Sequence, residues 1–373
     1  MFLNLATWPF RFISHQFSVT PHTIQPEAVQ RILLIRTAYI GDVIMTLPML
    51  KPLKEFFPQA SITVLTSQSA RQILLHNPCV EDILVYDPFW FYHEPSSSYI
   101  RFFQELRQRR FDLVIEARAD IRDILLLALP ARSNLKLSYA VGGGASVLSH
   151  VAPYEGLKHK VEYHLDLIKF LGCKTTDVDW NIYLTEYERE QTDLLLSTHG
   201  VHPPFICVHP GGRLPLKRWP IQRYAGLCDL VMDCCNIPVV LLAAKSEMNL
   251  VEEISRRMRH HPISLAGKIN LRQLSGIISK SSFMICNDSA PMHIAAALKT
   301  PVIAIFGPSD SVETGPWGKE HHIVEKIISC RHSCDESQCH NPSYHACMEA
   351  ITVNDVFDAV EQRMKISGVT IHG

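Results

Sequence analysis

Short, continuous apolar runs alternate with helical patterns along almost the whole chain, and this alternation limits the possible folds. Continuous apolar runs are typical of strands covered on both faces, and their alternation with helices predicts parallel sheets with crossover helices. Because 373 residues are many for one hydrophobic core, two α/β domains are expected. The expected strands are 31–36, 61–67, 82–87, 112–118 and 135–141 in the first domain, and 205–209, 238–244, 263–265, 282–286 and 301–306 in the second.

Helices should lie between these strands. The helical pattern at 43–56 contains Pro48 and Pro52, and an interior proline costs roughly 3 kcal/mol, so this helix should be kinked or should restart at Pro48. The other expected helices are 97–110, 121–129, 221–234, 247–258, 271–279, 291–298 and 353–364. The polar stretch 175–190 is the expected linker. The resulting division is an extension 1–29, a first domain 30–180, a second domain 181–350, and a C-terminal helix and tail 351–373.

Charge and hydropathy exclude several kinds of partner. The formal net charge is −1 and no basic block stands out, so nucleic acid is not expected to bind. No apolar run approaches the roughly 20 residues needed to span a bilayer. Residues 1–29 are rich in aromatic side chains but lack the basic start and uninterrupted apolar centre of a secretory signal. We interpret them as an extension packed on the domain surface; the alternative is an anchor lying among membrane headgroups.

Eleven cysteines without a secretory signal indicate a reducing, cytoplasmic environment. Four of them cluster near the C-terminus, at Cys330, Cys334, Cys339 and Cys347. Their spacing, C-x3-C-x4-C-x7-C, lacks the paired C-x2-C knuckles of zinc sites. No metal is therefore expected, and reduced packing thiols or a labile disulfide are favoured over zinc.

A strand expected at 282–286 runs directly into a helix through polar and small residues. The first backbone N–H groups of such a helix lack internal partners and the helix dipole adds positive charge, so Ser289 and Ala290 mark an anion site. His293, one turn into the helix, can donate to a bound ligand. Asp288 would be repelled by a diphosphate, so it should cap the helix or bind a sugar hydroxyl. The expected ligand is phosphorylated.

The strand expected at 205–209 ends in two glycines, Gly211 and Gly212, which let the backbone approach a ligand closely. Arg213, Lys217 and Arg218 follow and supply positive charge. These features favour a phosphate site over a plain surface turn with solvated cations. Further along, Glu247 follows another strand of this sheet and is expected either to cap the next helix or to accept bonds from ribose hydroxyls.

The first expected strand ends at Arg36 and Thr37 and leads through Gly41 to Asp42. This turn lacks G-x-G-x-x-G, which disfavours a dinucleotide-binding protein. From the spacing, Asp42 is more readily explained as a helix N-cap than as a general base. Arg118, with its charged neighbours at 120, 122 and 123, either lines the same side or forms surface pairs of little energetic value.

Three segments, in this order, resemble glycosyltransferase family 9, the ADP-heptose:lipopolysaccharide heptosyltransferases. Each is weak by itself, but the ordered set is specific for the family, though not for the acceptor. The likeness runs from about residue 31 to the last expected helix, and the cysteine-containing tail also looks like that of several members. The segments are IRTAYIGDV at 35–43 with TLP at 46–48, HPGGR at 209–213 with KRWP at 217–220, and NDSAPMH at 287–293 with FGPSD at 306–310.

The resemblance implies an α/β protein of GT-B type, in which two Rossmann-like domains turn parallel sheets towards an interdomain cleft. The N-terminal domain would hold a lipid-linked sugar acceptor and the C-terminal domain an ADP-activated sugar. Asp42 matches the proposed catalytic base of the family, and Lys217 matches its phosphate-contacting lysine. Glu247 matches the acid on the nucleoside side, and Asp288 and His293 match the donor-binding pair. Arg36, Thr37, Gly41 and Arg118 would then lie on the acceptor side.

The implied reaction is an inverting single displacement that moves a heptose, or a related sugar, to the lipopolysaccharide inner core. It requires no metal or cofactor, and it would take place in the cytoplasm, with peripheral contact with the inner membrane as the alternative. One position departs from the family: Ala290 stands where many members have glycine, and its methyl group crowds the closest backbone approach. The alternatives are another nucleotide sugar, a surface-polysaccharide acceptor, or a nucleotide-sugar-binding protein without turnover.

Overall fold

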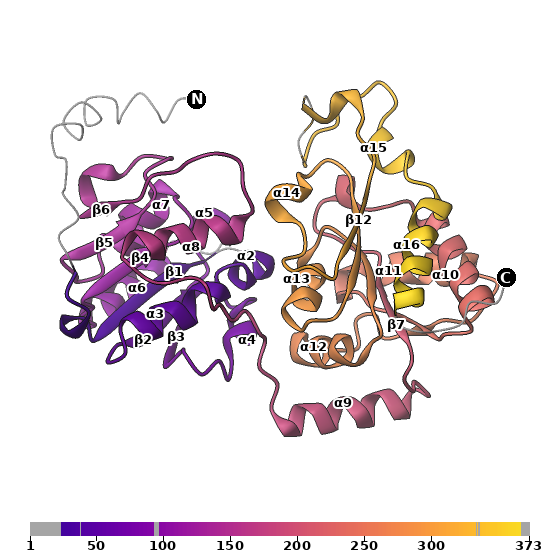
Figure 1. Cartoon of the computed structure of the whole chain (residues 1–373), viewed down its shortest axis with the longest axis horizontal. Helices are drawn as coiled ribbons and strands as arrows, with labels where there is room; N and C mark the ends of the chain where they lie inside the picture. Colours follow the sequence, from indigo (N-terminus) through magenta and orange to yellow (C-terminus); the bar gives the residue numbers. More distant parts are fainter. Residues whose placement is uncertain (1–23, 38, 93–96, 333, 335, 367–373) are drawn as a thin grey trace. The chain divides into compact units, whose positions relative to one another are not determined.

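The computed structural model describes residues 24–37, 39–92, 97–332, 334 and 336–366 (Figure 1). It contains two compact units, and the boundary falls between Tyr183 and Leu184. Each unit is built on one six-stranded sheet in which every pair of neighbouring strands is parallel. The prediction of two parallel α/β halves is therefore confirmed. Of the expected N-terminal extension, residues 1–23 lie outside the described part.

The sheet of the first unit has the order β3-β2-β1-β4-β5-β6. Its central strand β1 is buried on both faces, since Ile32, Leu33, Leu34 and Ile35 are all fully buried. This burial explains the continuous apolar run. The strands are β1 Arg31–Arg36, β2 Ser61–Thr66, β3 Asp82–Val85, β4 Leu113–Glu116, β5 Leu135–Ser138 and β6 His150–Val151.

The second unit repeats this topology, with the order β12-β11-β10-β7-β8-β9. Counted from the first strand of each unit, both sheets have the order 3-2-1-4-5-6 of doubly wound folds. In both, the strand order reverses between the first and fourth strands, at β1/β4 and at β7/β10. The strands are β7 Ile206–His209, β8 Val239–Leu241, β9 Ile263–Ser264, β10 Met284–Asn287, β11 Val302–Phe306 and β12 His322–Glu325.

The expected break at Pro48 is confirmed. Helix α2, Ile40–Ile44, is followed by a 3-10 turn, Leu47–Met49, and then by α3, Leu50–Phe56. Pro52 lies in the first turn of α3, where its missing N–H has no intrahelical partner to lose. The other helices of the first unit are α4 Arg71–Leu74, α5 Phe89–Tyr92, α6 Ser97–Gln108, α7 Ile121–Asp123 and α8 Lys160–Phe170. Helices α4, α5 and α8 were not expected.

In the second unit, α10, α11 and α16 cover one face of the sheet, and α12 and α13 cover the other (Figure 1). The C-terminal helix α16 contributes Val356, Phe357, Val360 and Met364 to the core shared with α10. The helices are α9 Glu186–Thr198, α10 Ile221–Cys235, α11 Met248–Arg257, α12 Leu271–Lys280, α13 Ala290–Ala297, α14 Ser311–Thr314, α15 Ala346–Glu349 and α16 Val353–Ile366. None of the helices in the described residues is both long and apolar enough to cross a membrane.

The prediction of a linker extending to residue 190 was wrong, because α9 begins at Glu186. This stretch is polar because its residues cap the start of α9 and lie on its solvent-exposed side. Thr185 and Glu188 form a reciprocal capping box at its start. Helix α9 then packs closely on α12: a Cβ on Gly276 would lie 2.1 Å from Thr192 Oγ1, so only glycine leaves room there.

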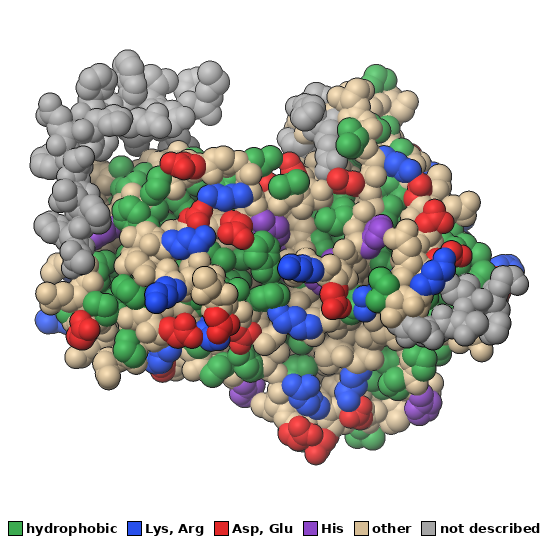
Figure 2. All heavy atoms as spheres, in the orientation of Figure 1, with side chains coloured by type: hydrophobic (Ala, Val, Ile, Leu, Met, Phe, Trp, Pro, Cys, Tyr) green, Lys and Arg blue, Asp and Glu red, His purple; other side chains and the backbone are tan. Residues whose placement is uncertain are grey.

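Charged side chains of both signs are interspersed on the face shown in Figure 2, without a continuous basic patch over the described residues of that face. One partly buried ion pair has a structural role. Arg272 of α12 donates to both carboxylate oxygens of Glu188, at 2.7 Å each. This bidentate bond holds the pKa of Glu188 at about 2, below its ordinary 4.5, and ties α9 to the second unit.

Glu188→Gln should destabilise the second unit at neutral pH, because it removes the charge while glutamine can still close the capping box. A carboxyl group whose pKa is lowered by folding stabilises the protein above its unfolded pKa, and this contribution disappears as the pH falls through the folded pKa. We expect a loss on the order of 1–2 kcal/mol at neutral pH in urea unfolding. The variant and the parent should converge between the ordinary value of 4.5 and about 2.

Glu190→Gln removes an exposed charge from the same helix and serves as the control, with little expected effect. An equal loss for Glu188→Gln at acidic and neutral pH would contradict the assignment.

Candidate active site

Asn287, the last residue of β10, organises the switch point of the second sheet. Its side chain is fully buried, and its Oδ1 accepts from Trp219 N at 3.1 Å and from the Tyr224 hydroxyl at 2.8 Å. Its Nδ2 donates to the carbonyls of Pro210 and Gly211, at 2.7 and 3.0 Å. One amide thus joins the end of β10 to the loop after β7 and to the start of α10. The sequence analysis gave Asn287 no role, although an asparagine that ends an apolar strand signals a buried polar partner.

Glu247 fixes the glycine loop after β7. Its Oε1 accepts from Gly212 N at 2.7 Å and its Oε2 from Ala244 N at 3.2 Å, so it closes the 3-10 turn Lys245–Glu247. It makes no side-chain capping bond to α11, so the interpretation of Glu247 as the cap of the next helix was wrong. His209 Nε2 lies 3.6 Å from the same carboxylate. A Cβ on Gly211 would lie 2.4 Å from Glu247 Oε1, which explains the glycine. The predicted contact of Glu247 with a ribose stays a prediction.

Lys217 lies opposite Asp288. It ends the 3-10 turn Pro215–Lys217, and its Nζ lies 2.8 Å from Asp288 Oδ2 and 2.8 Å from Glu336 Oε1. Burial lowers the pKa of Lys217, but these two carboxylates outweigh it and leave the pKa raised, so the side chain is a fixed cation. The prediction that Asp288 caps a helix was wrong. The N-cap of α13 is Ser289, and its side chain makes no capping bond.

The remaining predicted site residues of the second unit lie in the loop after β7 and in α13. Ala290 is the first residue of α13, and His293 lies further along the same helix with 6% of its surface exposed. Arg213 is exposed in the loop after β7. The structure therefore brings Gly211, Gly212, Lys217, Glu247 and Asp288 together by direct or shared contacts, and it places Ser289, Ala290 and His293 in the chain that follows Asp288.

In the first unit, Asp42 lies inside the first turn of α2, and Tyr39 is the N-cap. The interpretation of Asp42 as an N-cap was therefore wrong. Its Oδ1 instead accepts from Arg36 Nη2 at 2.9 Å, and 28% of its side-chain surface remains exposed. Arg36, at the end of β1, is buried and also donates to the carbonyl of Ala117 at 3.4 Å. A buried guanidinium thus positions an accessible carboxylate.

Two buried carboxyl groups, those of Glu116 and Asp123, lie near this pair, at and beyond the end of β4. Burial and the nearby Asp123 raise the pKa of the fully buried Glu116 to about 8. Asp123 accepts from Thr37 Oγ1 at 3.1 Å and from Trp90 Nε1 at 3.0 Å. The sequence analysis did not identify Glu116 or Trp90, because their proximity depends on strand pairing and on a distant helix.

Arg118 does not simply form a surface ion pair. Its guanidinium lies 3.5 Å from the ring centre of Phe91 and 3.7 Å from Asp120, and 20% of its side-chain surface is exposed. Gly41 is buried inside α2. Arg36, Thr37, Asp42 and Arg118 therefore lie at the β1/β4 switch point, the edge at which an open α/β sheet binds its ligand.

Two doubly wound units of this kind define the GT-B class of glycosyltransferase folds. The fold is similar to that of a glycosyl transferase family 9 structure from Veillonella parvula DSM 2008, with a TM-score of 0.80 and 21% identity over 92% of this chain and 99% of that one. It is also similar to Escherichia coli heptosyltransferase WaaC with ADP, with a TM-score of 0.71 and 20% identity over 90% of this chain and 100% of that one.

The chain belongs to glycosyltransferase family 9 (heptosyltransferase), whose pattern matches residues 99–345. It is 31% identical over 338 residues to lipopolysaccharide heptosyltransferase 3 of Escherichia coli K12, which covers 87% of this chain and 95% of the relative. The family membership implied by the three motifs is thus confirmed.

Gly211→Ala should disturb this site, whereas Gly212→Ala should not. The new methyl group at 211 would displace the Glu247 carboxylate and leave the N–H of Gly212 without its partner, at a cost of about 1–3 kcal/mol. At 212 the nearest atom to a new Cβ is Arg218 Cγ at 3.8 Å, an ordinary contact. Urea unfolding of both variants checks this, and equal stability of the two would contradict the close approach at Gly211.

Proposed function

We propose that this protein transfers a heptose from an ADP-activated donor to a sugar of the lipopolysaccharide core. The observation that carries the proposal is its similarity, over nearly the full length of the relative, to lipopolysaccharide heptosyltransferase 3. The solved relative WaaC was obtained with ADP, which supports an ADP-linked donor. Because the acceptor would be lipid-linked, we place the reaction at the cytoplasmic face of the inner membrane.

The donor would bind to the second unit at the β7/β10 switch point. Lys217 is a cation there with 14% of its side-chain surface exposed, and Glu336 supplies a carboxylate oxygen 2.8 Å from its ammonium group. The Glu336 side chain is 42% exposed, so a diphosphate can take its place on Lys217. Asp288 would keep Lys217 in position and would accept a bond from a donor hydroxyl. Ser289 and Ala290, where α13 begins, would add backbone N–H groups to the diphosphate.

The acceptor would bind to the first unit, with Asp42 as the general base. Asp42 would take the proton from the attacking hydroxyl while that oxygen forms a bond to the anomeric carbon. The bond from this carbon to the diphosphate would break from the opposite face, so the configuration would invert. Arg36 would act as a positioning residue, since it fixes Asp42 from a buried site. Arg118 and Thr37 would line the acceptor side.

The negative charge that develops on the departing diphosphate would be stabilised by fixed groups of the protein. Lys217 and the start of α13 carry positive charge that needs no reorganisation during the reaction. We therefore propose that turnover does not depend on a divalent metal ion.

The central experiment measures ADP release from ADP-heptose with and without a lipid A–inner-core acceptor. Release that depends on the acceptor, together with a gain of one heptose in the mass spectrum of the product, is expected. Binding of ADP-heptose without acceptor-dependent release would instead indicate a nucleotide-sugar-binding protein.

Asp42→Asn should retain donor binding and lose turnover by roughly a hundredfold or more, because a positioned base typically contributes that much. Single-turnover rates and ADP-heptose titrations check this. Asp177→Asn, which removes an exposed carboxylate paired with Lys51 in the same unit, should leave the rate unchanged. Near-normal turnover of Asp42→Asn would refute the role of Asp42.

Lys217→Gln should weaken ADP binding by about ten- to a hundredfold, because a charge-assisted hydrogen bond contributes roughly 1.5–3 kcal/mol. Calorimetric titration with ADP checks this value. Lys365→Gln, at an exposed position near the end of α16, is the control and should bind ADP as the parent does. Glu336→Gln should not weaken binding, since it removes only the carboxylate that the diphosphate replaces. Unchanged affinity of Lys217→Gln would place the phosphates elsewhere.

A further inference from the structure

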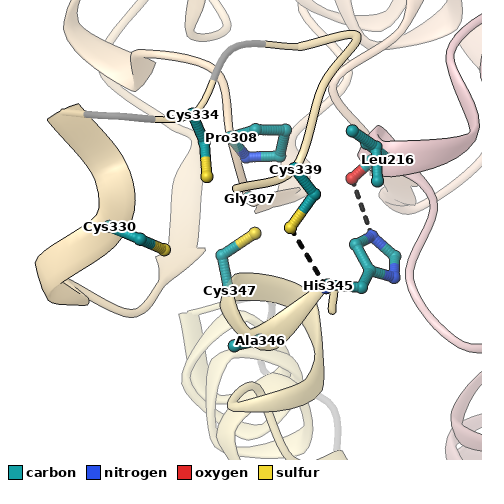
Figure 3. Close-up of a pocket in the computed structure, with 9 residues that line it drawn as sticks. All are labelled: Leu216, Gly307, Pro308, Cys330, Cys334, Cys339, His345, Ala346 and Cys347. Carbon is teal, nitrogen blue, oxygen red and sulfur yellow. Dashed lines mark hydrogen bonds between the residues drawn. The ribbon is translucent and has the colours of Figure 1, made fainter. Parts of the chain in front are cut away.

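The four C-terminal cysteines line one pocket of the second unit (Figure 3). Figure 3 shows the sulfur atoms of Cys330, Cys334, Cys339 and Cys347 pointing into the same space. They come from different pieces of chain: the 3-10 turn Ser329–His332, the loop that follows it, and α15. The remaining wall is formed by His345 and by Leu216, Gly307, Pro308 and Ala346. Tertiary folding thus brings the four thiols together, although their spacing in the sequence lacks the paired C-x2-C knuckles of zinc sites.

Two of these sulfurs accept backbone hydrogen bonds in the same way. The N–H of His340 lies 3.2 Å from Cys334 Sγ, and the N–H of His345 lies 3.4 Å from Cys339 Sγ. In each case the donor follows the cysteine by six residues, so the chain folds back over the sulfur twice. A hydrogen bond to sulfur favours the thiolate, which is the form that binds metal ions.

The remaining electrostatics oppose several thiolates without a counter-charge. Four thiolates around one pocket would repel one another, because like charges at short range disfavour the charged form. None of the eleven cysteines, all within the described residues, forms a disulfide. A bound cation would remove the repulsion and make the N–H···S bonds favourable.

We propose that Cys330, Cys334, Cys339 and Cys347 bind one thiophilic metal ion, Zn²⁺ or Fe²⁺, through four thiolates. Soft sulfur ligands in this number select such ions over Mg²⁺ or Ca²⁺. On binding, each of the four thiols releases its proton to solvent and no redox partner is needed. Within the described residues no three His, Cys, Asp or Glu side chains are already spaced as metal ligands, so the four sulfurs must move closer together as the ion enters.

His345 is not among the proposed ligands. Its Nε2 lies 2.8 Å from the carbonyl oxygen of Leu216, which directs the ring away from the sulfurs (Figure 3). This contact and the Glu336–Lys217 pair join the cysteine segment to the turn that carries Lys217. The metal would therefore have a structural role, holding the segment against that turn.

The test measures the metal content of the full-length protein, purified under reducing conditions without chelator. One equivalent of zinc or iron per chain is expected by elemental analysis. Replacement with Co²⁺ should give the sulfur-to-metal charge-transfer absorption of thiolate coordination. Cys339→Ser and Cys347→Ser should lose most of the metal, whereas Cys234→Ser, a half-buried cysteine of α10 outside the pocket, should keep it.

The wild-type measurements need no variant and no substrate, so they stand apart from the proposed transferase activity. Protein that contains no zinc or iron, and that takes up neither Zn²⁺ nor Co²⁺ on reconstitution, would overturn the proposal. An intact mass showing a disulfide among the four cysteines of freshly reduced and desalted protein would do the same. Equal metal loss in Cys234→Ser would also count against the four-cysteine assignment.

Discussion

The buried amide of Asn287 is the contact on which the geometry of the second unit's site depends. It satisfies all its hydrogen-bonding capacity by joining β10 to the loop after β7 and to the start of α10. A buried amide left unpaired would cost about 1–3 kcal/mol, so breaking these hydrogen bonds would destabilise the second unit. The glycine loop, the Lys217 turn and Asp288 all start from chain that Asn287 holds in place. Trp219, whose N–H it accepts, also reaches Ile351 before α16 and so connects the site to the C-terminal core.

The two units have the same strand topology. Each sheet reverses its strand order beside its first strand, and each places a cation–carboxylate pair at that point: Arg36–Asp42 in one and Lys217–Asp288 in the other. The exposures of the pairs differ in a way that suits the proposed roles. Asp42 is the more accessible member of its pair, as a base must be. Lys217 is a partly buried cation, and its second carboxylate partner, Glu336, is more exposed and can be replaced by a ligand.

Much of the fold could be predicted because parallel strands and amphipathic helices are local patterns. The proline break before α3 and the strands at the two switch points were found in this way. The start of α9 was taken for linker because its capping and exposed residues are polar, and α4, α5 and α8 were not recognised. The caps assigned to Asp42 and Asp288 were wrong for another reason. A carboxylate near a helix start has a local partner in the backbone, but in both cases a cation from outside the helix binds it instead.

The sequence by itself determined the α/β class, the pairing of strand ends with glycines and charged residues, and the family to which the ordered motifs point. These follow from hydrophobic periodicity and from residue types at fixed spacing, which act over short stretches of chain. Only the tertiary structure decided which carboxylate each cation holds, that Glu116 lies buried behind Arg36, and that four unevenly spaced cysteines share one pocket. Such contacts depend on how the elements pack together, and their energies depend on burial, which no local pattern encodes.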